Sequence, residues 1–325
     1  MVNRRPIDNS ESEIDNPGMS VRIGIGVPGF PFSSPAKFLE WVDLCEESAI
    51  DSLWFSERLV SLQNLPEPLM AMAVVAGRTR RLKFGMNAVV LPFRDPLVLA
   101  KECATLDFLS DGRLLPAFGV GADTAPEFRA TSRKPVGRGA LSDEMLELMP
   151  RLWSEDHITH HGKHFQYEDV SISPKPKQKP LPLWIGGSSD AAIRRTATLG
   201  SGWLAGLQSP AQVAPVVTKI RAAVAEAGRE IEPDHYGAGF PFRFGSLDEP
   251  IVQRTMAGYA RLGSDVDPTA TFAIGDAATI VARAREYHAA GISKFVLRPL
   301  GASDEEMMDQ TRRLIAKVVP EVHRW

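Results

Sequence analysis

Strand-like and helix-like segments alternate along almost the whole chain, and this alternation constrains the fold more than any other feature. Apolar runs typical of buried strands cover residues 21–27, 53–55, 82–91, 113–118, 181–187, 201–207, 235–245 and 294–300. Segments with helical periodicity separate them. Strands that alternate with helices pair in parallel through crossover connections, so eight such units predict an α/β fold of the (β/α)8 TIM-barrel type. An open, doubly wound sheet is the alternative, because the sequence does not show which strands pair.

The spacing between predicted strands widens between the fourth and the fifth. A helix predicted over residues 139–153 is followed by HITHHGKHFQYED and by the proline-rich SPKPKQKPLP, which cannot form a regular helix. We therefore expect an insertion between strands 4 and 5. Residues 1–20 are polar, and they predict a flexible N-terminal arm before a single domain that spans residues 21–325.

The charge balance argues against a nucleic-acid partner. Lys and Arg number 37 and Asp and Glu 40, for a net charge of −3, whereas nucleic-acid binders carry a basic excess. No apolar run is long enough to span a bilayer, and the N-terminus has no signal-peptide pattern. Cys45 and Cys103 lie among apolar residues and are predicted to be buried free thiols. These features predict a cytoplasmic enzyme that binds neither nucleic acid nor a membrane.

Glycines end two of the predicted strands. Gly119 and Gly121 follow the fourth strand, and the stretch from Gly186 to Ser189 links the fifth strand to a helix. Turns and helix N-caps alone can explain such residues. In a barrel, however, these strand ends form the mouth, where glycines leave room for a flat ligand and a helix N-terminus attracts an anion. Together the two sites predict a planar cofactor that carries a phosphate, although neither matches a Walker loop or GxGxxG.

Longer motifs run through most of the chain. They are AIDSLWFSER, LPFRDPLVLAKECATLDFLSDGRLLPAFGVGA, LSDEMLELMPRLW, HHGKHFQYEDVSISPKPKQKPLPLWIGGSS, LGSGW and GDAATIVARAREYHAAGISKFVLRP. In these stretches the sequence resembles the luciferase-like family of flavin- and deazaflavin-dependent oxidoreductases. The segment that contains RDP, LAKECATLDFLSDGR and GVG is the most specific, whereas residues 1–20 and 232–271 match poorly.

The resemblance implies a (β/α)8 barrel that holds FMN or coenzyme F420 at its mouth. It implies that the cofactor ring lies over the ends of strands three and four, with the phosphate near the loop after strand five. The positions that match are Asn87, Ala88, Gly119, Val120 and Gly121 for the ring, and Gly186, Gly187, Ser188 and Ser189 for the phosphate. Some members of the family have a non-proline cis peptide bond at the position of Asn87–Ala88.

One position departs from the family pattern. Many members carry an acidic residue followed by histidine at the end of strand two, whereas here Glu57 is followed by Arg58. An arginine cannot act as a base near neutral pH, so a mechanism that uses that histidine does not transfer. The catalytic residues stay unassigned, with Glu57 and Arg58 as candidates.

Further candidates lie near other strand ends. Trp203 on strand six and Arg298 on strand eight are candidates for the substrate pocket, and Arg94 after strand three is a further candidate for a functional role. Four histidines, His157, His160, His161 and His164, fall close together, but their spacing fits no common zinc site. We therefore predict no metal site.

A helix predicted after strand two is apolar almost all round. The residues concerned are Leu69, Met70, Met72, Ala73, Val74 and Val75. A helix with this pattern is usually buried on both sides, whereas the outer ring of a barrel buries only one. The pattern therefore predicts a homodimer.

The leading functional hypothesis is an oxidoreductase that uses coenzyme F420 to transfer hydride to or from a small organic substrate. The loop GVGAD, followed by Glu127 and Phe128, resembles the F420-dependent branch. The acidic tail of that cofactor needs cationic partners, for which the candidates are Arg58, Arg129, Arg133, Lys134 and Arg138. The alternatives are an FMN-dependent monooxygenase that uses reduced flavin and O2, and a non-catalytic flavin-binding protein. A barrel hydrolase would need metal ligands or paired carboxylates at strand ends, where only Glu57 stands.

Overall fold

The computed structural model describes residues 21–262 and 267–325, so the arm predicted over residues 1–20 lies outside the described residues. The strands are β1 (Arg22–Val27), β2 (Ser52–Phe55), β3 (Lys83–Met86), β4 (Val89–Val90), β5 (Leu114–Leu115), β6 (Ala117–Gly119), β7 (Ile158–His161), β8 (Gln166–Val170), β9 (Trp184–Gly186), β10 (Gly202–Leu204), β11 (Tyr236–Ala238), β12 (Pro241–Phe244), β13 (Ala273–Gly275) and β14 (Lys294–Pro299).

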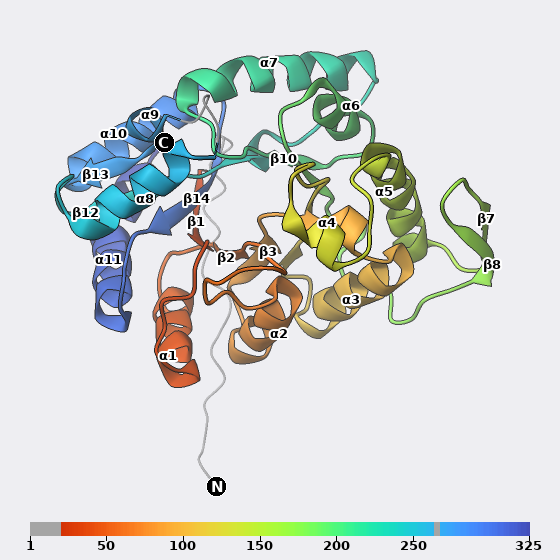
Figure 1. Ribbon diagram of the computed structural model, residues 1–325, viewed down its shortest axis with the longest axis horizontal. Helices are drawn as coiled ribbons and strands as arrows, with labels where there is room; N and C mark the ends of the chain where they lie inside the picture. Colours follow the sequence, from red (N-terminus) through yellow and green to blue (C-terminus); the bar gives the residue numbers. More distant parts are fainter. Residues whose placement is uncertain (1–20, 263–266) are drawn as a thin grey trace, which may run out of the picture.

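The helices are α1 (Pro35–Glu46), α2 (Pro68–Arg78), α3 (Pro96–Leu109), α4 (Pro126–Ala130), α5 (Arg138–Ser154), α6 (Asp190–Thr198), α7 (Pro210–Glu226), α8 (Pro250–Ala260), α9 (Pro268–Thr271), α10 (Ala277–Ala289), α11 (Asp304–Lys317) and α12 (Val319–Val322). Two short 3-10 helices, η1 (Leu91–Phe93) and η2 (Pro233–His235), complete the described elements. Helices surround the curled sheet (Figure 1).

The strands of the sheet pair in parallel and form a circuit round the barrel. β1 pairs with β2 on one side and with β14 on the other, and β2 pairs with β3. β3 pairs with β5 and β4 with β6, and β6 continues the circuit through β9, β10 and β11 to β14. The predicted (β/α)8 fold class is therefore confirmed, and the open doubly wound alternative is wrong.

Three of the predicted strands are each divided into two pieces, and the seventh gives β11 and β12. Strand three is divided into β3 and β4 at Asn87–Ala88, where the peptide bond is cis, as the resemblance implies. Strand four is divided into β5 and β6 at Pro116, which has no N–H group to give to the ladder. The pieces after the breaks in strands three and four, β4 and β6, form the rim of the barrel mouth.

Between β6 and β9 the chain forms α4, α5 and a two-stranded antiparallel hairpin of β7 and β8. This is the stretch for which the sequence predicts an insertion. The two strands of the hairpin lack the apolar alternation that marks a half-buried strand, because few of their side chains are buried. β13, which pairs with β12 outside the main circuit, is also missing from the sequence prediction.

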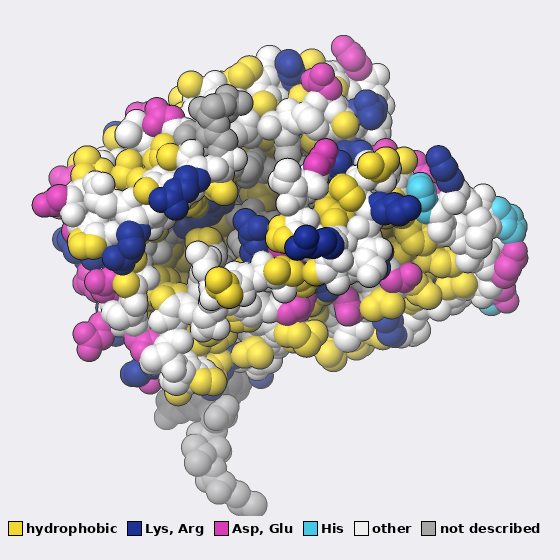
Figure 2. Space-filling model, in the orientation of Figure 1, with side chains coloured by type: hydrophobic (Ala, Val, Ile, Leu, Met, Phe, Trp, Pro, Cys, Tyr) yellow, Lys and Arg dark blue, Asp and Glu magenta, His cyan; other side chains and the backbone are white. Residues whose placement is uncertain are grey.

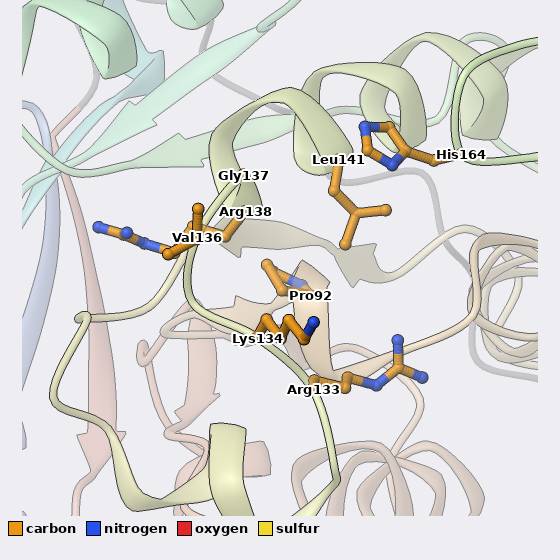
Figure 3. Close-up of a pocket in the computed structure, with 8 residues that line it drawn as sticks. All are labelled: Pro92, Arg133, Lys134, Val136, Gly137, Arg138, Leu141 and His164. Atoms are coloured by element: carbon orange, nitrogen blue, oxygen red, sulfur yellow. The ribbon is translucent and has the colours of Figure 1, made fainter.

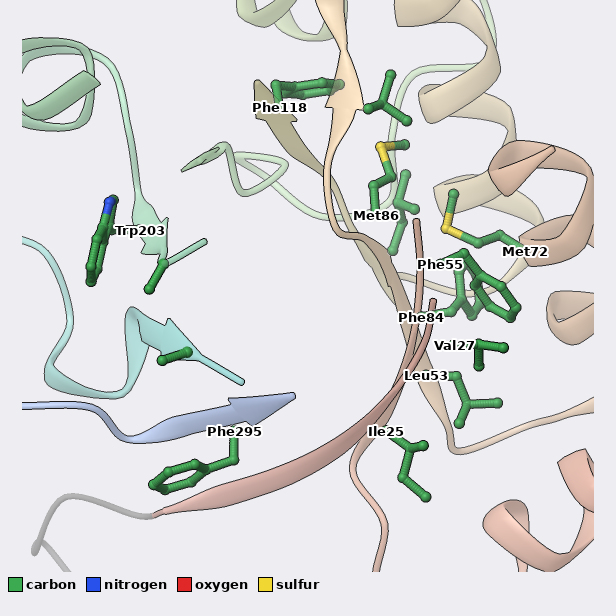
Figure 4. Packing of buried hydrophobic residues seen from close by; sticks show 14 of the residues in the cluster. Ile25, Val27, Leu53, Phe55, Met72, Phe84, Met86, Phe118, Trp203 and Phe295 are labelled. Carbon is green, nitrogen blue, oxygen red and sulfur yellow. The ribbon is translucent and has the colours of Figure 1, made fainter. Parts of the chain in front are cut away.

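The inside of the barrel is filled by large side chains. Val296 on β14 packs inward with Trp54, Ala117, Trp184 and Leu204, and the rings of the two tryptophans meet edge to face at 6.0 Å. Glycines opposite them provide the space: a methyl group built on Gly202 would lie 2.6 Å from a ring atom of Trp184. The alternate residues of the strands, among them Phe295 and Phe84, pack outward in a second cluster (Figure 4).

Buried charges gather at the end of the barrel where the strands begin. Lys294 forms an ion pair with Asp51, and both side chains are largely buried. Although burial alone would raise it, the positive charges of Lys294 and Lys83 hold the pKa of Asp51 below its usual value. Arg113, which precedes β5, donates five hydrogen bonds to Ser110, Thr79, Leu82 and Ala76. We call this the closed end, because its interior is packed and its charges have partners.

Candidate cofactor site at the barrel mouth

Small residues from three strands meet at the opposite end of the barrel. A methyl group built on Gly119 would lie 3.8 Å from the Cβ of Ala88, its nearest neighbour. One built on Gly186 would lie 3.7 Å from the same atom and 3.4 Å from the carbonyl oxygen of Phe118. Ala88, Gly119 and Gly186 are therefore neighbours, and they form a cradle whose space larger side chains would fill.

Exposure changes abruptly at the same level in each strand. Met86, Phe118 and Ile185 are buried. The nine residues predicted to bind the cofactor follow them, and all nine are partly or fully exposed: Asn87, Ala88, Gly119, Val120, Gly121, Gly186, Gly187, Ser188 and Ser189. The structure thus brings the two predicted glycine sites together on one accessible surface. Figure 2 shows the molecule hollowed between the halves that carry α8 and α4, with Lys and Arg side chains around the hollow.

The turn after β9 leaves backbone donors free. Gly187 has a φ of +104°, a conformation that favours glycine. Ser189 caps α6, its hydroxyl accepting from the N–H of Ala192 at 3.3 Å. Within residues 21–262 and 267–325, no acceptor takes the N–H groups of Gly187 and Ser188. Such a turn at the positive end of a helix has the features of an anion site.

Trp203 lies elsewhere than predicted. Its side chain is fully buried, and its indole Nε1 donates to the carbonyl oxygen of Gly187 at 2.7 Å. Side chains alternate along a strand, and on β10 it is Leu204 that points into the barrel. Trp203 therefore packs on the outer face of the sheet, and its assignment to an open substrate pocket is wrong. Its hydrogen bond to Gly187 stabilises the glycine turn from the outer face of the sheet.

The candidates Glu57 and Arg58 are adjacent in sequence but differ in surroundings. The carboxylate of Glu57 accepts from the N–H of Val90 at 2.7 Å and pairs with Arg94, which also contacts Glu67 at 2.6 Å. Burial of this side chain raises the pKa of Glu57 above its usual value, although Arg94 opposes the shift. Glu57 and Arg94 thus anchor β4 beside Ala88. Arg58 is exposed and has no ionic or hydrogen-bonding partner among the described residues.

A basic cavity of about 230 Å³ adjoins the loop after β6 (Figure 3). It is lined by Pro92, Arg133, Lys134, Val136, Gly137, Arg138, Leu141 and His164. Arg138 donates to the carbonyl oxygen of Gly121 at 3.2 Å and pairs with Asp123. Three of the five cations predicted for an acidic tail therefore share one cavity, whereas Arg58 and Arg129 do not line it.

Histidines of the stretch around β7 contact carboxylate side chains of the hairpin and of α5. His157 contacts Asp169 at 2.6 Å and His160 contacts Glu144 at 3.1 Å. No group of three or more His, Cys, Asp or Glu side chains in the described part of the chain is arranged to hold a metal ion.

Arg298, the last candidate from the sequence, projects into the barrel from β14. Its contact Tyr259 lies on α8, in a region where the sequence gives no functional signal.

Comparisons with known proteins agree with this architecture. The profile of the family described as luciferase-like monooxygenase matches residues 15–263. The chain is 25% identical to an F420-dependent glucose-6-phosphate dehydrogenase of Kineococcus radiotolerans over 197 residues, which are 59% of this chain and 58% of that one. It also matches 56% of an uncharacterized protein of Mycobacterium bovis at 30% identity over 164 residues, or 50% of this chain. The chain thus spans little more than half the length of these relatives.

Two solved structures share the fold. The crystal structure of monooxygenase RslO1 from Streptomyces bottropensis superposes with a TM-score of 0.78 at 21% identity, covering 92% of this chain and 99% of that one. An F420-dependent secondary alcohol dehydrogenase superposes with a TM-score of 0.79 at 18% identity, covering 94% and 99%. Within the described residues, no helix has the length and apolar character needed to cross a membrane.

Proposed function

The chain belongs to the luciferase-like monooxygenase family, and from this membership we propose that it is an oxidoreductase that binds a flavin-type cofactor at the barrel mouth. The observation that carries the proposal is the cradle of Ala88, Gly119 and Gly186, which leaves space where side chains would otherwise stand. When bound, the cofactor supplies the two-electron redox chemistry, and the protein supplies binding and orientation.

The residues of the mouth fit such a cofactor. Ala88, Gly119 and Gly186 allow a flat ring to approach the backbone, and the N–H groups of Gly187 and Ser188 are available to a phosphate. Below the cradle, Trp54 and Trp184 close the barrel and keep water out of its interior. Glu57 has a positioning role in this proposal, since it holds the backbone at Val90.

We favour coenzyme F420, with hydride transfer to or from a small organic substrate, over FMN. The basic cavity beside Gly121 supports this choice, because Arg133, Lys134 and Arg138 could accept the acidic tail that FMN lacks. The relative named as an F420-dependent dehydrogenase is consistent with it. An FMN-dependent monooxygenase is the second candidate, supported by the likeness to monooxygenase RslO1.

Titration of the purified protein with both cofactors tests the proposal. Coenzyme F420 should bind more tightly than FMN, and its affinity should fall more steeply with salt, because exposed ion pairs are screened over about 8 Å at physiological ionic strength. Tighter binding of FMN without measurable F420 binding would move the assignment to the monooxygenase. Binding of neither cofactor would refute the proposal.

We also propose that the protein is a homodimer that works in the cytoplasm. One face of α2 is buried, yet Met70 and Val74 on its other face are exposed, as is Val98 on the adjacent α3. Such apolar exposure on neighbouring helices is typical of an interface. Sedimentation should show a dimer that Met70→Glu weakens; a monomeric wild type at micromolar concentration would refute the dimer proposal.

The proposed location in the cytoplasm rests on the buried free thiols of Cys45 and Cys103, which support a reducing compartment.

A further inference from the structure

Arg298 lies inside the barrel at the mouth. It is the penultimate residue of β14, and side chains alternate along the strand so that Val296 and Arg298 both point inward. A methyl group built on Gly26 of β1 would lie 2.9 Å from Cγ1 of Val296 and 3.2 Å from Cγ of Arg298. The arginine stem therefore crosses β1 at Gly26, one layer above the packed interior.

The charge of Arg298 has no acidic partner within the described part of the chain. Only 6% of the residue is exposed, and the one hydrogen bond that its side chain makes there runs from Nη1 to the hydroxyl of Tyr259 on α8, at 3.2 Å. Among the described residues, Arg298 forms no ion pair, and the acidic residues Glu57 and Glu249 pair with Arg94 and Arg243 instead. A guanidinium has five N–H donors and stays charged at physiological pH. Burying a charge without a partner is costly, so this arrangement indicates a ligand that neutralises it.

The position of Arg298 separates it from the proposed phosphate site. β14 is the eighth strand of the circuit and β6 the fourth, so in a ring of eight they stand opposite each other. The turn at Gly187 follows β9, three strands from β14. A phosphate held at that turn is therefore not the group that Arg298 faces.

We propose that Arg298 recognises an anionic oxygen group of the substrate, a carboxylate, a phosphate or a sulfonate, and that Tyr259 orients the guanidinium for this contact. The planar fork of arginine matches such groups through two parallel hydrogen bonds. This inference rests on the proposed function, because it assigns the opposite side of the mouth to the cofactor. It defines the substrate class as small organic acids or their phosphate or sulfonate counterparts.

The test compares three variants with the wild type. Acetate, inorganic phosphate and methanesulfonate are titrated at constant ionic strength, with binding followed by calorimetry and thermal shift. At least one anion should bind the wild type about tenfold more tightly than Arg298→Met, and Tyr259→Phe should show a smaller, about threefold, loss. The matched control is Arg254→Met, since Arg254 is exposed on α8 and its loss removes the same charge. It should respond like the wild type.

Equal responses of the wild type and Arg298→Met to all three anions would overturn the inference. So would a loss of thermal stability of more than about 5 °C in Arg298→Met, because that would identify the arginine as structural. An unliganded, unpaired charge should instead be neutral or unfavourable to stability. Failure of Arg298→Met to fold would also identify the arginine as structural, and Arg298→Lys then distinguishes a need for charge from a need for the fork.

Cofactor titrations distinguish the two possible sources of the anion. Affinities of Arg298→Met for F420 and FMN within about twofold of the wild type support a substrate anion. A loss of about tenfold or more would assign the anion to the cofactor and overturn the inference while leaving the proposed function intact. If neither cofactor binds the wild type but the anions still distinguish Arg298→Met, the anion site stands and the proposed function fails.

Discussion

The two ends of the barrel differ in how their buried charged residues and their glycines are surrounded. At the closed end Arg113 is buried with five hydrogen bonds and Lys294 is buried against Asp51. At the mouth Arg298 is as deeply buried, but its side chain has one hydrogen bond within the described residues. Glycines differ in the same sense, since Gly202 makes room for Trp184, whereas a methyl group on Gly119 would meet only Ala88, at 3.8 Å. The contrast indicates that the closed end stabilises the chain, and it supports the proposal that the mouth binds ligands.

The ion pair at the closed end should give the largest effect on stability. Asp51→Asn leaves Lys294 buried without its partner, so we expect the free energy of unfolding to fall by about 3–5 kcal/mol at neutral pH. The folded-state pKa of Asp51 is lowered, so its contribution is complete above its unfolded-state pKa of about 4 and is lost as the pH falls. Urea unfolding should therefore show the wild type and Asp51→Asn converging below about pH 4. A constant difference down to strongly acidic pH would contradict this assignment.

Arg113 provides the next comparison. Arg113→Met leaves the carbonyl groups of Ala76 and Leu82 without a buried donor, and we expect a loss of about 2–4 kcal/mol in urea unfolding. Arg298→Met, which removes one hydrogen bond and an unpaired charge, should change stability by less than about 1 kcal/mol. Equal losses in the two variants would erase the distinction between the ends.

Much of this contrast is visible in the sequence, because apolar periodicity marks all eight strands and the main helices. The turns at Gly119 and Gly186 are also marked, since glycine after a buried run indicates a strand end. The orientation of Trp203 could not be predicted from the sequence, because a shift of one residue in a short strand turns a side chain to the other face. The contact of Glu57 with Arg94 could not be predicted either, because Arg94 is distant in sequence and becomes adjacent only when the barrel forms. The hairpin of β7 and β8 escapes because it has few buried side chains.

Two tryptophans allow a smaller, matched comparison. Trp203 donates to the carbonyl of Gly187 at 2.7 Å and Trp153 to that of Ala100 at 3.0 Å. Trp203→Phe and Trp153→Phe each remove one indole hydrogen bond, so both should lose about 1 kcal/mol of stability. Only Trp203→Phe should also weaken cofactor binding, by about threefold to tenfold, because it alone supports the glycine turn. Equal cofactor affinities in the two variants, measured by fluorescence titration, would argue against the phosphate site.

One substitution made at both ends of the barrel tests the central claim most directly. Valine at Gly202 would clash with Trp184, since its Cβ would lie 2.6 Å from a ring atom, whereas valine at Gly119 meets only Ala88 at 3.8 Å. The measurement is the cofactor affinity and unfolding free energy of Gly119→Val and Gly202→Val beside the wild type. We predict that Gly119→Val keeps its stability within about 1 kcal/mol but binds cofactor at least about tenfold more weakly, and that Gly202→Val loses about 2 kcal/mol or more. Cofactor binding by Gly119→Val at wild-type affinity would contradict the account.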